Sequence, residues 1–118
     1  MTNIKIYNKI ADEGLDLLKK RGYQLDGEGD YQGILLRSEK LTDHEFPQSL
    51  LGIARAGAGT NNIPVERCTE DGIVVFNTPG ANANAVKELI LMTLLMSVRP
   101  VLRARQWITN LKSDDPET

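Results

Sequence analysis

Two arginines and a loop with two glycines stand directly after short apolar runs of this sequence. Arg37 follows residues 34–36, and Arg55 follows residues 52–54 and begins the segment RAGAGTNN. Arginine presents a charged fork that matches a carboxylate or a phosphate, and glycine lets backbone N–H groups approach a ligand closely. These residue types in this order therefore indicate a site for a small anion.

A second interpretation of the loop is purely structural. Gly57 and Gly59 can serve only to make a tight turn, with the arginines solvated at the strand ends, and spacing alone does not separate the two interpretations. A dinucleotide fingerprint is excluded, because Asn62 stands where the third glycine of GxGxxG would fall and residues 73–85 contain no Asp or Glu. The P-loop pattern GxxxxGK[ST] is also absent.

The remaining reactive side chains indicate no second site. His44 is the single histidine, lies in a polar Asp-His-Glu context and is expected at the surface. Cys68 has no CxxC companion, so we expect a structural thiol. One histidine and one cysteine cannot build a zinc site, so no metal is expected.

Five short segments with strand character must carry these loops. They are residues 3–7, 23–25, 34–36, 52–54 and 73–76. Residues 11–20, 42–51 and 65–71 are predicted helices; in the second, Thr42 and Glu45 have capping-box spacing and Pro47 can interrupt the helix. The link 26–32 is too short for a helical crossover, so either residues 23–25 are not a full strand or their link to the next strand is abbreviated.

Alternating strands and helices predict an α/β fold with a doubly wound parallel sheet of four to five strands. In such a sheet, ligands bind beyond the carboxyl ends of the strands. The segments that begin at Arg37, Arg55 and Asn77 are therefore expected to meet at one edge.

The last third of the chain differs in character. Residues 84–98 form an apolar run whose charges are the adjacent pair Lys87 and Glu88, which predicts a long helix that is buried on nearly every face. Pro100 separates it from a second predicted helix, and residues 112–118 are expected to be a tail. We thus expect an α/β domain at 1–83 and a helical connector at 84–111, through which the chain forms a homodimer or a swapped oligomer.

Composition narrows the function classes. A chain of 118 residues has room for one core, and its net charge of -2, with basic residues spread along it, argues against a nucleic-acid partner. Its longest nearly uncharged run is about ten residues, short of the roughly 20 that a membrane span needs. A single cysteine and the absence of a secretory signal pattern predict a cytoplasmic protein.

Three stretches carry a resemblance to a known family. The segments LLRSEKLT (35–42) and IARAGAGTNNIPVERCTEDGIVVFNTPGANANAVKELI (53–90), with the helix that follows, contain the patterns RAGxGxxNI and NTPxxNxxxVxE. They resemble the N-terminal part of the NAD-dependent D-2-hydroxyacid dehydrogenases, and the resemblance extends over about residues 3–107. Members of that family usually carry Asp at the loop position that Asn61 occupies in this chain.

The resemblance implies a flavodoxin-like, substrate-binding domain from an enzyme that oxidises 3-phosphoglycerate to 3-phosphohydroxypyruvate with NAD in serine biosynthesis. Arg37 and Arg55 would hold the phosphate or carboxylate of this anionic substrate. The backbone of Ala58 and Gly59 would meet the carboxylate, with Ala58 on the nicotinamide side. Asn82 would contact the substrate or support its loop.

The resemblance also implies what this chain lacks. The family's catalytic histidine, its paired carboxylate, its substrate-orienting arginine and its glycine motif belong to the nucleotide-binding domain, and no residue here matches them. We therefore expect no catalytic residue in this chain, no tight NAD binding and no activity from the 118 residues alone.

A different class of function stays open. A stand-alone, non-enzymatic flavodoxin-like module would bind a small anion or a partner protein with the same loops. A receiver domain is one example, but it needs acidic residues where this sequence has Asn8-Lys9 and Arg37-Ser38.

Overall fold

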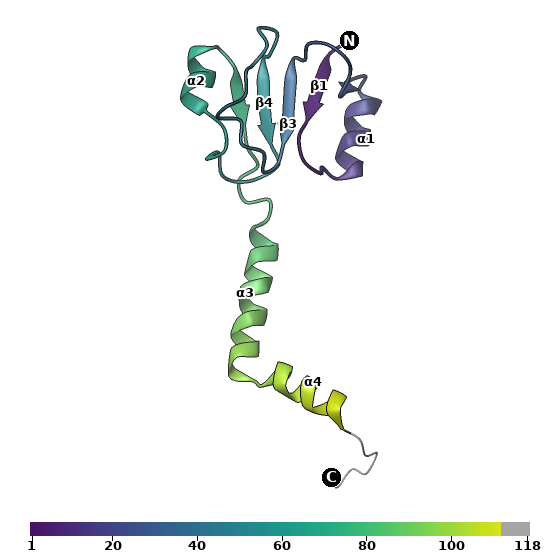
Figure 1. The fold of residues 1–118 in the computed structure, drawn as a ribbon, viewed down its shortest axis with the longest axis vertical. Coiled ribbons are helices and arrows are strands. Elements are labelled where there is room, and N and C mark those ends of the chain that lie inside the picture. The colour runs from purple at the N-terminus through teal and green to yellow at the C-terminus, as the bar shows by residue number, and fades with distance from the viewer. Residues whose placement is uncertain (112–118) are drawn as a thin grey trace. The chain divides into compact units, whose positions relative to one another are not determined.

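The computed structural model describes residues 1–111, which form two compact units (Figure 1). The first unit comprises residues 1–82 and contains all strands of the described chain. The second unit begins at Ala83 and consists of helices. The predicted tail, residues 112–118, lies outside the described residues.

The first unit is built on a sheet of five parallel strands in the order β2-β1-β3-β4-β5. The strands are β1 (Asn3–Ile6), β2 (Gln24–Leu25), β3 (Gly33–Leu36), β4 (Gly52–Arg55) and β5 (Val74–Phe76). From β1 the chain first builds one edge and then passes to the other side of β1, as a doubly wound sheet does. The predicted α/β fold class is confirmed.

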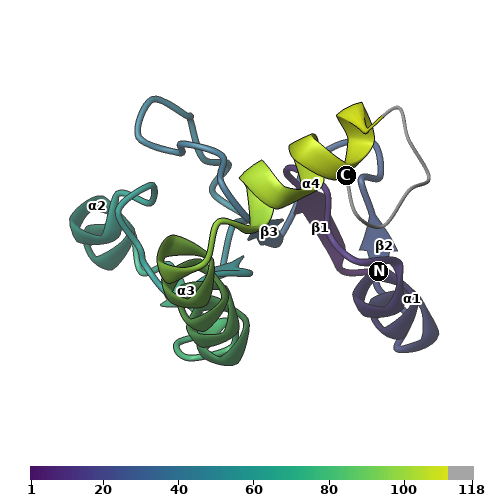
Figure 2. The same cartoon turned by 90° about the horizontal axis from the view of Figure 1, so that it is seen from below.

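Two helices connect strands of this sheet. The helix α1 (Asp12–Lys20) joins β1 to β2, and α2 (Val65–Glu70) joins β4 to β5. Acidic residues occupy the first turn of α1 and basic residues its last turn, which complements the helix dipole. Seen from below, α1 lies on one face of the sheet and the segment between β3 and β4 lies on the opposite face (Figure 2).

The predicted helix at 42–51 is wrong, because that segment consists of turns and irregular backbone. Pro47 lacks the N–H that a helix interior needs, and its carbonyl instead accepts a hydrogen bond from Leu50 N at 3.0 Å. The N–H of Leu41 donates to the carbonyl of Asn62 at 2.9 Å. Turns at both ends let Leu41 and Leu50 enter the core, and this burial outweighs the capping-box signal.

The short link from β2 to β3 is organised by the buried side chain of Asn3, which is 6% exposed. Its Oδ1 accepts the N–H of Gly27 at 3.0 Å, and its Nδ2 donates to the carbonyls of Gly27 at 3.1 Å and Asp30 at 3.4 Å. These bonds replace those that a crossover helix would have made. The link is thus abbreviated, as its length predicted.

The core of the first unit lies on the face that carries the β3–β4 segment and α2. Leu36 and Ile53, from β3 and β4, are completely buried, and Cys68 of α2 is equally inaccessible. The full set of buried apolar residues is Ile34, Leu36, Leu41, Leu50, Ile53, Ile63, Cys68 and Ile73. Four of its members, Leu41, Leu50, Ile63 and Ile73, come from segments outside the helices and strands, so the loops of this domain are part of its packing.

The second unit contains α3 (Ala83–Val98) and α4 (Val101–Asn110), which begin and end within one residue of the predicted bounds. No side chain of either helix is buried in the described chain. Within this unit Leu94 and Leu95 are 60% and 68% exposed, so the packing of α4 alone does not provide the burial predicted for α3. In the part of the chain that the structure describes, no helix has the length and apolar character needed to cross a membrane.

Candidate functional site

The carboxyl ends of β3 and β4 bring the two predicted arginines together. Leu36, the last residue of β3, is paired in register with Arg55, the last residue of β4, and Arg37 follows directly. Parallel strands end at the same edge, so the segments beginning at Arg37 and Arg55 start side by side. We refer to residues 37–39 as the β3 loop and to residues 55–62 as the β4 loop.

The guanidinium of Arg55 joins these two loops. Its Nε donates to the backbone carbonyl of Arg37 at 3.0 Å, and its Nη1 donates to Oδ1 of Asn61 at 3.3 Å. A Cβ added at Gly57 would lie 3.2 Å from Nε, and one at Gly59 would lie 3.0 Å from Nη1. The Arg55 side chain therefore packs closely against the backbone at both glycines, and a side chain at either position would crowd the guanidinium.

This arrangement decides the role of the Gly-x-Gly pattern. In a dinucleotide fold, glycines let the backbone approach a pyrophosphate. Here the space beside Gly57 and Gly59 is filled by the chain's own Arg55 side chain. The Gly-x-Gly pattern here accommodates the Arg55 side chain.

The segment after β5 holds the β4 loop from the other side. Asn77 Nδ2 donates to the carbonyl of Ala58 at 2.7 Å, and Thr78 N donates to the carbonyl of Gly57 at 2.9 Å. Both bonds use loop carbonyls, and neither uses the N–H groups of Ala58 or Gly59. The loop is thus held in place with its amide donors left for other acceptors.

The β3 loop is held by Asn8, a residue that sequence reasoning did not place in the site. The Oδ1 of Asn8 accepts the backbone N–H groups of Arg37, Ser38 and Glu39 at 3.4, 2.8 and 2.7 Å. Asn8 adopts a positive φ of 67°, which asparagine tolerates better than most residues. The sequence feature that could have pointed to it is an asparagine directly after the predicted strand at residues 3–7.

Two further side chains surround Glu39. Asn62 Nδ2 donates to the Glu39 carbonyl at 2.6 Å, while Asn62 Oδ1 is buried without a hydrogen-bond partner among the described residues. His44 Nε2 lies 3.5 Å from a carboxylate oxygen of Glu39, and its ring packs edge-on against Tyr7 at a centroid distance of 5.3 Å. His44 is partly exposed at the surface, as predicted, with part of its ring covered by this packing.

Neither Arg37 nor Arg55 has a carboxylate within 4.0 Å among residues 1–111. Arg37 is exposed and Arg55 is half-buried. The strand edge therefore carries two positive charges that the described chain does not neutralise, beside glycine-loop amides. A small anion with two negative groups complements this arrangement.

Asn82 is not joined to this cluster. It lies exposed in the turn that ends the first unit, and no hydrogen bond within the described residues links it to the arginines or to the β4 loop. Ala58 and Gly59 are exposed within the β4 loop itself. The structure thus places Arg37, Arg55, Ala58 and Gly59 on two adjoining loops, and Asn82 on the segment that follows β5.

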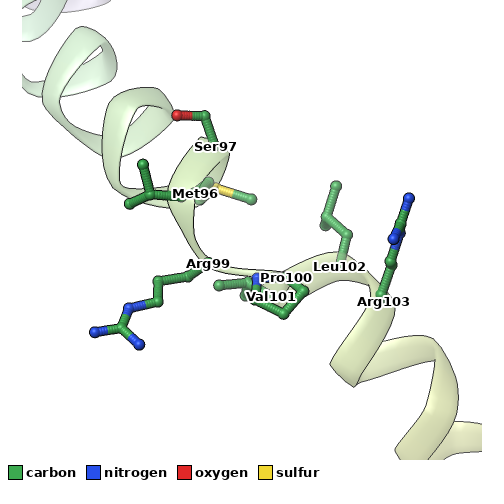
Figure 3. A pocket seen from close by; sticks show the side chains of 8 residues that line it. Met96, Ser97, Arg99, Pro100, Val101, Leu102 and Arg103 are labelled. Carbon is green, nitrogen blue, oxygen red and sulfur yellow. The ribbon is translucent and has the colours of Figure 1, made fainter.

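A hollow of about 430 Å³ lies within the helical unit (Figure 3). It is lined by consecutive residues from Met96 to Arg103, at the bend around Pro100. Arg99 and Arg103 extend from opposite sides of this bend (Figure 3). The hollow is the inner angle between α3 and α4, with no convergent set of polar groups from separate elements.

Residues 1–111 contain no cluster of three His, Cys, Asp or Glu side chains that could hold a metal ion. The Cys68 thiol is fully buried, and this burial raises its pKa. A raised pKa keeps the thiol protonated and poorly nucleophilic, which suits the structural role predicted for it.

Comparison with known proteins identifies the family. Residues 4–110 match the family model described as D-isomer specific 2-hydroxyacid dehydrogenase, catalytic domain. The chain belongs to this family. The match covers nearly all the described residues, so it confirms the family resemblance carried by the two loop motifs.

Individual family members differ in their named activities. The chain is 28% identical over 116 residues to D-3-phosphoglycerate dehydrogenase from Archaeoglobus fulgidus, covering 86% of this chain and 22% of that protein. It is 47% identical over 60 residues to hydroxypyruvate reductase from Thermotoga maritima, covering 51% of this chain and 20% of that protein. The chain therefore spans about a fifth of the length of these curated relatives.

A solved member of the family has the same fold. The NAD+-bound 3-phosphoglycerate dehydrogenase of Entamoeba histolytica superposes with a TM-score of 0.68 at 28% identity, over 80% of this chain and 38% of that one. Together with the family match, this likeness favours a dehydrogenase domain over a stand-alone, non-enzymatic module.

Proposed function

We propose that this chain is the substrate-binding domain of an NAD-dependent dehydrogenase that oxidises 3-phosphoglycerate to 3-phosphohydroxypyruvate, a step of serine biosynthesis. The observation that carries the proposal is the pair Arg37 and Arg55, two arginines at one strand edge of a 2-hydroxyacid dehydrogenase domain that have no carboxylate partner among residues 1–111. The single, unpaired cysteine supports a cytoplasmic protein.

The two arginines have different freedom, which suggests separate tasks. Arg55 is anchored by two hydrogen bonds beside the β4 loop, so it and the N–H groups of Ala58 and Gly59 would hold the substrate carboxylate. Arg37 has an exposed side chain that can reach the phosphate group, at the other end of the substrate from the carboxylate. Asn82 would approach the substrate from the segment after β5.

This chain contributes binding and orientation. In the reaction, NAD accepts the hydride from the substrate carbon that bears the hydroxyl group. No residue of this chain matches the family's proton-transferring histidine, and the sequence lacks the GxGxxG dinucleotide fingerprint. We therefore expect the 118 residues alone to be inactive and to bind NAD weakly at most.

An NMR titration of the 118-residue chain with 3-phosphoglycerate tests the proposal. We expect the amide signals of residues 55–62 to shift, and the affinity to fall in Arg37→Gln and Arg55→Gln but not in Arg103→Gln, which lies on α4. No shift in the wild-type chain, or equal losses in all three variants, would refute the proposed site. Turnover with NADH and 3-phosphohydroxypyruvate well above blank would refute the expected inactivity.

Hydroxypyruvate is the second candidate substrate, because the relative with the highest identity reported above is a hydroxypyruvate reductase. This ligand has a carboxylate and no phosphate. If hydroxypyruvate binds as tightly as 3-phosphoglycerate, and Arg37→Gln affects neither, the phosphate assignment is wrong. Selective loss of 3-phosphoglycerate binding in Arg37→Gln supports it.

We also propose that the chain associates with itself through residues 84–111, as a two-fold dimer or by exchange of helices. Large apolar side chains line both α3 and α4 in the exposed state, among them Leu91, Leu95 and Leu102. Burying one such side chain contributes about 1.5 to 3 kcal/mol, which favours association in water. We thus expect two partners for this domain, a small anionic substrate and a second copy of the same chain.

Light scattering at high micromolar concentration tests this association. We expect an oligomer for the wild type and a shift toward monomer for the double variant Leu91→Lys, Leu95→Lys. Glu88→Lys, on the same helix, controls for added positive charge. A wild-type chain that stays monomeric would refute the proposal.

A further inference from the structure

We propose that Asn61 sets the anion affinity of the strand-edge site, because it holds Arg55 in place without neutralising its charge. This inference rests on the proposed function of the site. It assigns to Asn61 a positioning role that acts through Arg55, and it explains why an amide at this place favours a ligand with negative charge.

Both acceptors that hold Arg55 are uncharged. Its Nε bonds to the backbone carbonyl of Arg37, and its Nη1 bonds to the amide oxygen of Asn61 at 3.3 Å. No carboxylate of residues 1–111 lies within 4.0 Å of the guanidinium. The side chain is thus fixed in direction while its full positive charge remains available to a ligand.

Residue 61 lies close enough to Arg55 and to the β4 loop for a charge at this position to affect a bound ligand. A Cβ added at Gly59 would lie 3.2 Å from Asn61 Oδ1 and 3.0 Å from Arg55 Nη1. The amide oxygen and the guanidinium therefore flank the same backbone position of the β4 loop. A ligand that uses the loop amides and Arg55 would meet Asn61 directly.

Aspartate at position 61 would keep the shape and the acceptor oxygen but would change the electrostatics. Its carboxylate would pair with Arg55 and would repel an incoming anion. Exposed ion pairs are worth up to about 1 kcal/mol, equivalent to about fivefold in affinity. We therefore expect Asn61→Asp to weaken anion binding about fivefold.

If Asn61 acted only by tethering the Arg55 side chain, Asn61→Asp and Asn61→Ala would rank in the opposite order of anion affinity. A carboxylate would hold Arg55 at least as firmly as an amide, because charge-assisted hydrogen bonds are stronger than neutral ones. If tethering alone mattered, Asn61→Asp would bind anions as well as the wild type, and Asn61→Ala would be the weaker variant. The charge role predicts that Asn61→Ala, which preserves the free charge of Arg55, binds better than Asn61→Asp.

The experiment is an NMR titration of the full 118-residue chain with sulfate and, separately, with 3-phosphoglycerate. The wild type, Asn61→Asp and Asn61→Ala are compared with Asn110→Asp, which makes the same change in net charge on α4. Thermal melting of each variant establishes that it is folded, and Asn61→Ser replaces any that is not. We expect Asn61→Asp to lose about fivefold, Asn61→Ala to lose less than Asn61→Asp, and Asn110→Asp to bind as the wild type does. The loss in Asn61→Asp should shrink when NaCl is added, because salt screens exposed charges.

Two results would overturn the inference in distinguishable ways. If the wild type binds both anions and Asn61→Asp binds them equally well, or if Asn110→Asp loses as much, the role of Asn61 is refuted while the proposed site stands. If the wild type shows no shift with either anion, the proposed function fails, and the inference fails with it.

Discussion

The side-chain oxygen of Asn8 lies 2.7 Å from the backbone nitrogen of Glu39 and accepts its hydrogen bond. Through this contact and the bonds from Arg37 and Ser38, one amide oxygen after β1 fixes the direction of the chain after β3. The anion-binding role proposed for Arg37 depends on this backbone direction. The Asn8–Glu39 contact thus connects the segment after β1 to the β3 loop that carries Arg37.

Replacing Asn8 tests this link. We expect Asn8→Gly to lower the free energy of unfolding by about 1 kcal/mol, because three N–H donors lose their acceptor and turn to water. Asn8→Ala should cost about 1 kcal/mol more, since the positive φ of 67° strains a residue that has a Cβ. Urea denaturation measures both, and Asn8→Asp, which keeps an acceptor, should stay near the wild type. Equal stability of Asn8→Gly and wild type would contradict this account.

The adjacent residues Leu50 and Leu51 test whether the irregular β3–β4 segment belongs to the core. Leu50 is 4% exposed and Leu51 is 66% exposed. We expect Leu50→Ala to lower the free energy of unfolding by about 2 to 5 kcal/mol, because it leaves a cavity. Leu51→Ala should change it by less than about 0.5 kcal/mol. Similar effects of the two substitutions in urea denaturation would show that this segment does not pack as described.

Asn3 is expected to be the residue on which the abbreviated β2–β3 link depends. Asn3→Ala removes the partners of Gly27 N–H and of two carbonyls beneath the link, and we expect a loss of about 2 kcal/mol. Asn3→Asp keeps the acceptor for Gly27 but turns a second oxygen toward the carbonyls of Gly27 and Asp30, so it should also destabilise. Hydrogen exchange should then show faster exchange of the Gly27 amide in Asn3→Ala than in Asn3→Asp. The reverse order would be evidence against this bonding scheme.

The buried thiol of Cys68 predicts a loss of stability at alkaline pH. Burial raises the pKa of Cys68 in the folded chain, so the unfolded chain loses its thiol proton first. The stability that this group contributes is present below the ordinary thiol pKa of about 8.5 and falls as the pH rises toward the higher folded value. Urea denaturation at about pH 7 and about pH 10 should show a larger fall for the wild type than for Cys68→Ala.

The comparison with Cys68→Ala also controls for Tyr31. The pKa of Tyr31 is raised by its own burial and by Tyr7, so it adds an alkaline loss of stability to both proteins. The difference between the two proteins therefore reports Cys68. If both fall equally with pH, the thiol is not protected in the folded chain.

Much of the fold could be predicted from short-range patterns. Apolar runs in the sequence predicted β3 and β4. Local chemistry also favours the ends of the helices, since α1 has acidic residues in its first turn and basic residues in its last, and Gly72, just after α2, has a φ of 72°. Because parallel strands end at the same edge, the sequence also predicted that the segments beginning at Arg37 and Arg55 would meet. The pairing of Leu36 with Arg55, and the hydrogen bond from Arg55 Nε to the Arg37 carbonyl, agree with this. These features depend on neighbours in sequence or on a general property of parallel sheets.

The sequence by itself thus determined the α/β class, the strand edge, its arginines and the family motifs. Only the tertiary structure decided that residues 42–51 are not a helix, since burial of Leu41 and Leu50 outweighs a local capping signal. It also decided which asparagines matter, because the partners of Asn3, Asn8 and Asn62 lie 23 to 31 residues away along the chain. Local composition does not report such contacts, which depend on the parallel strands bringing distant loops to one edge.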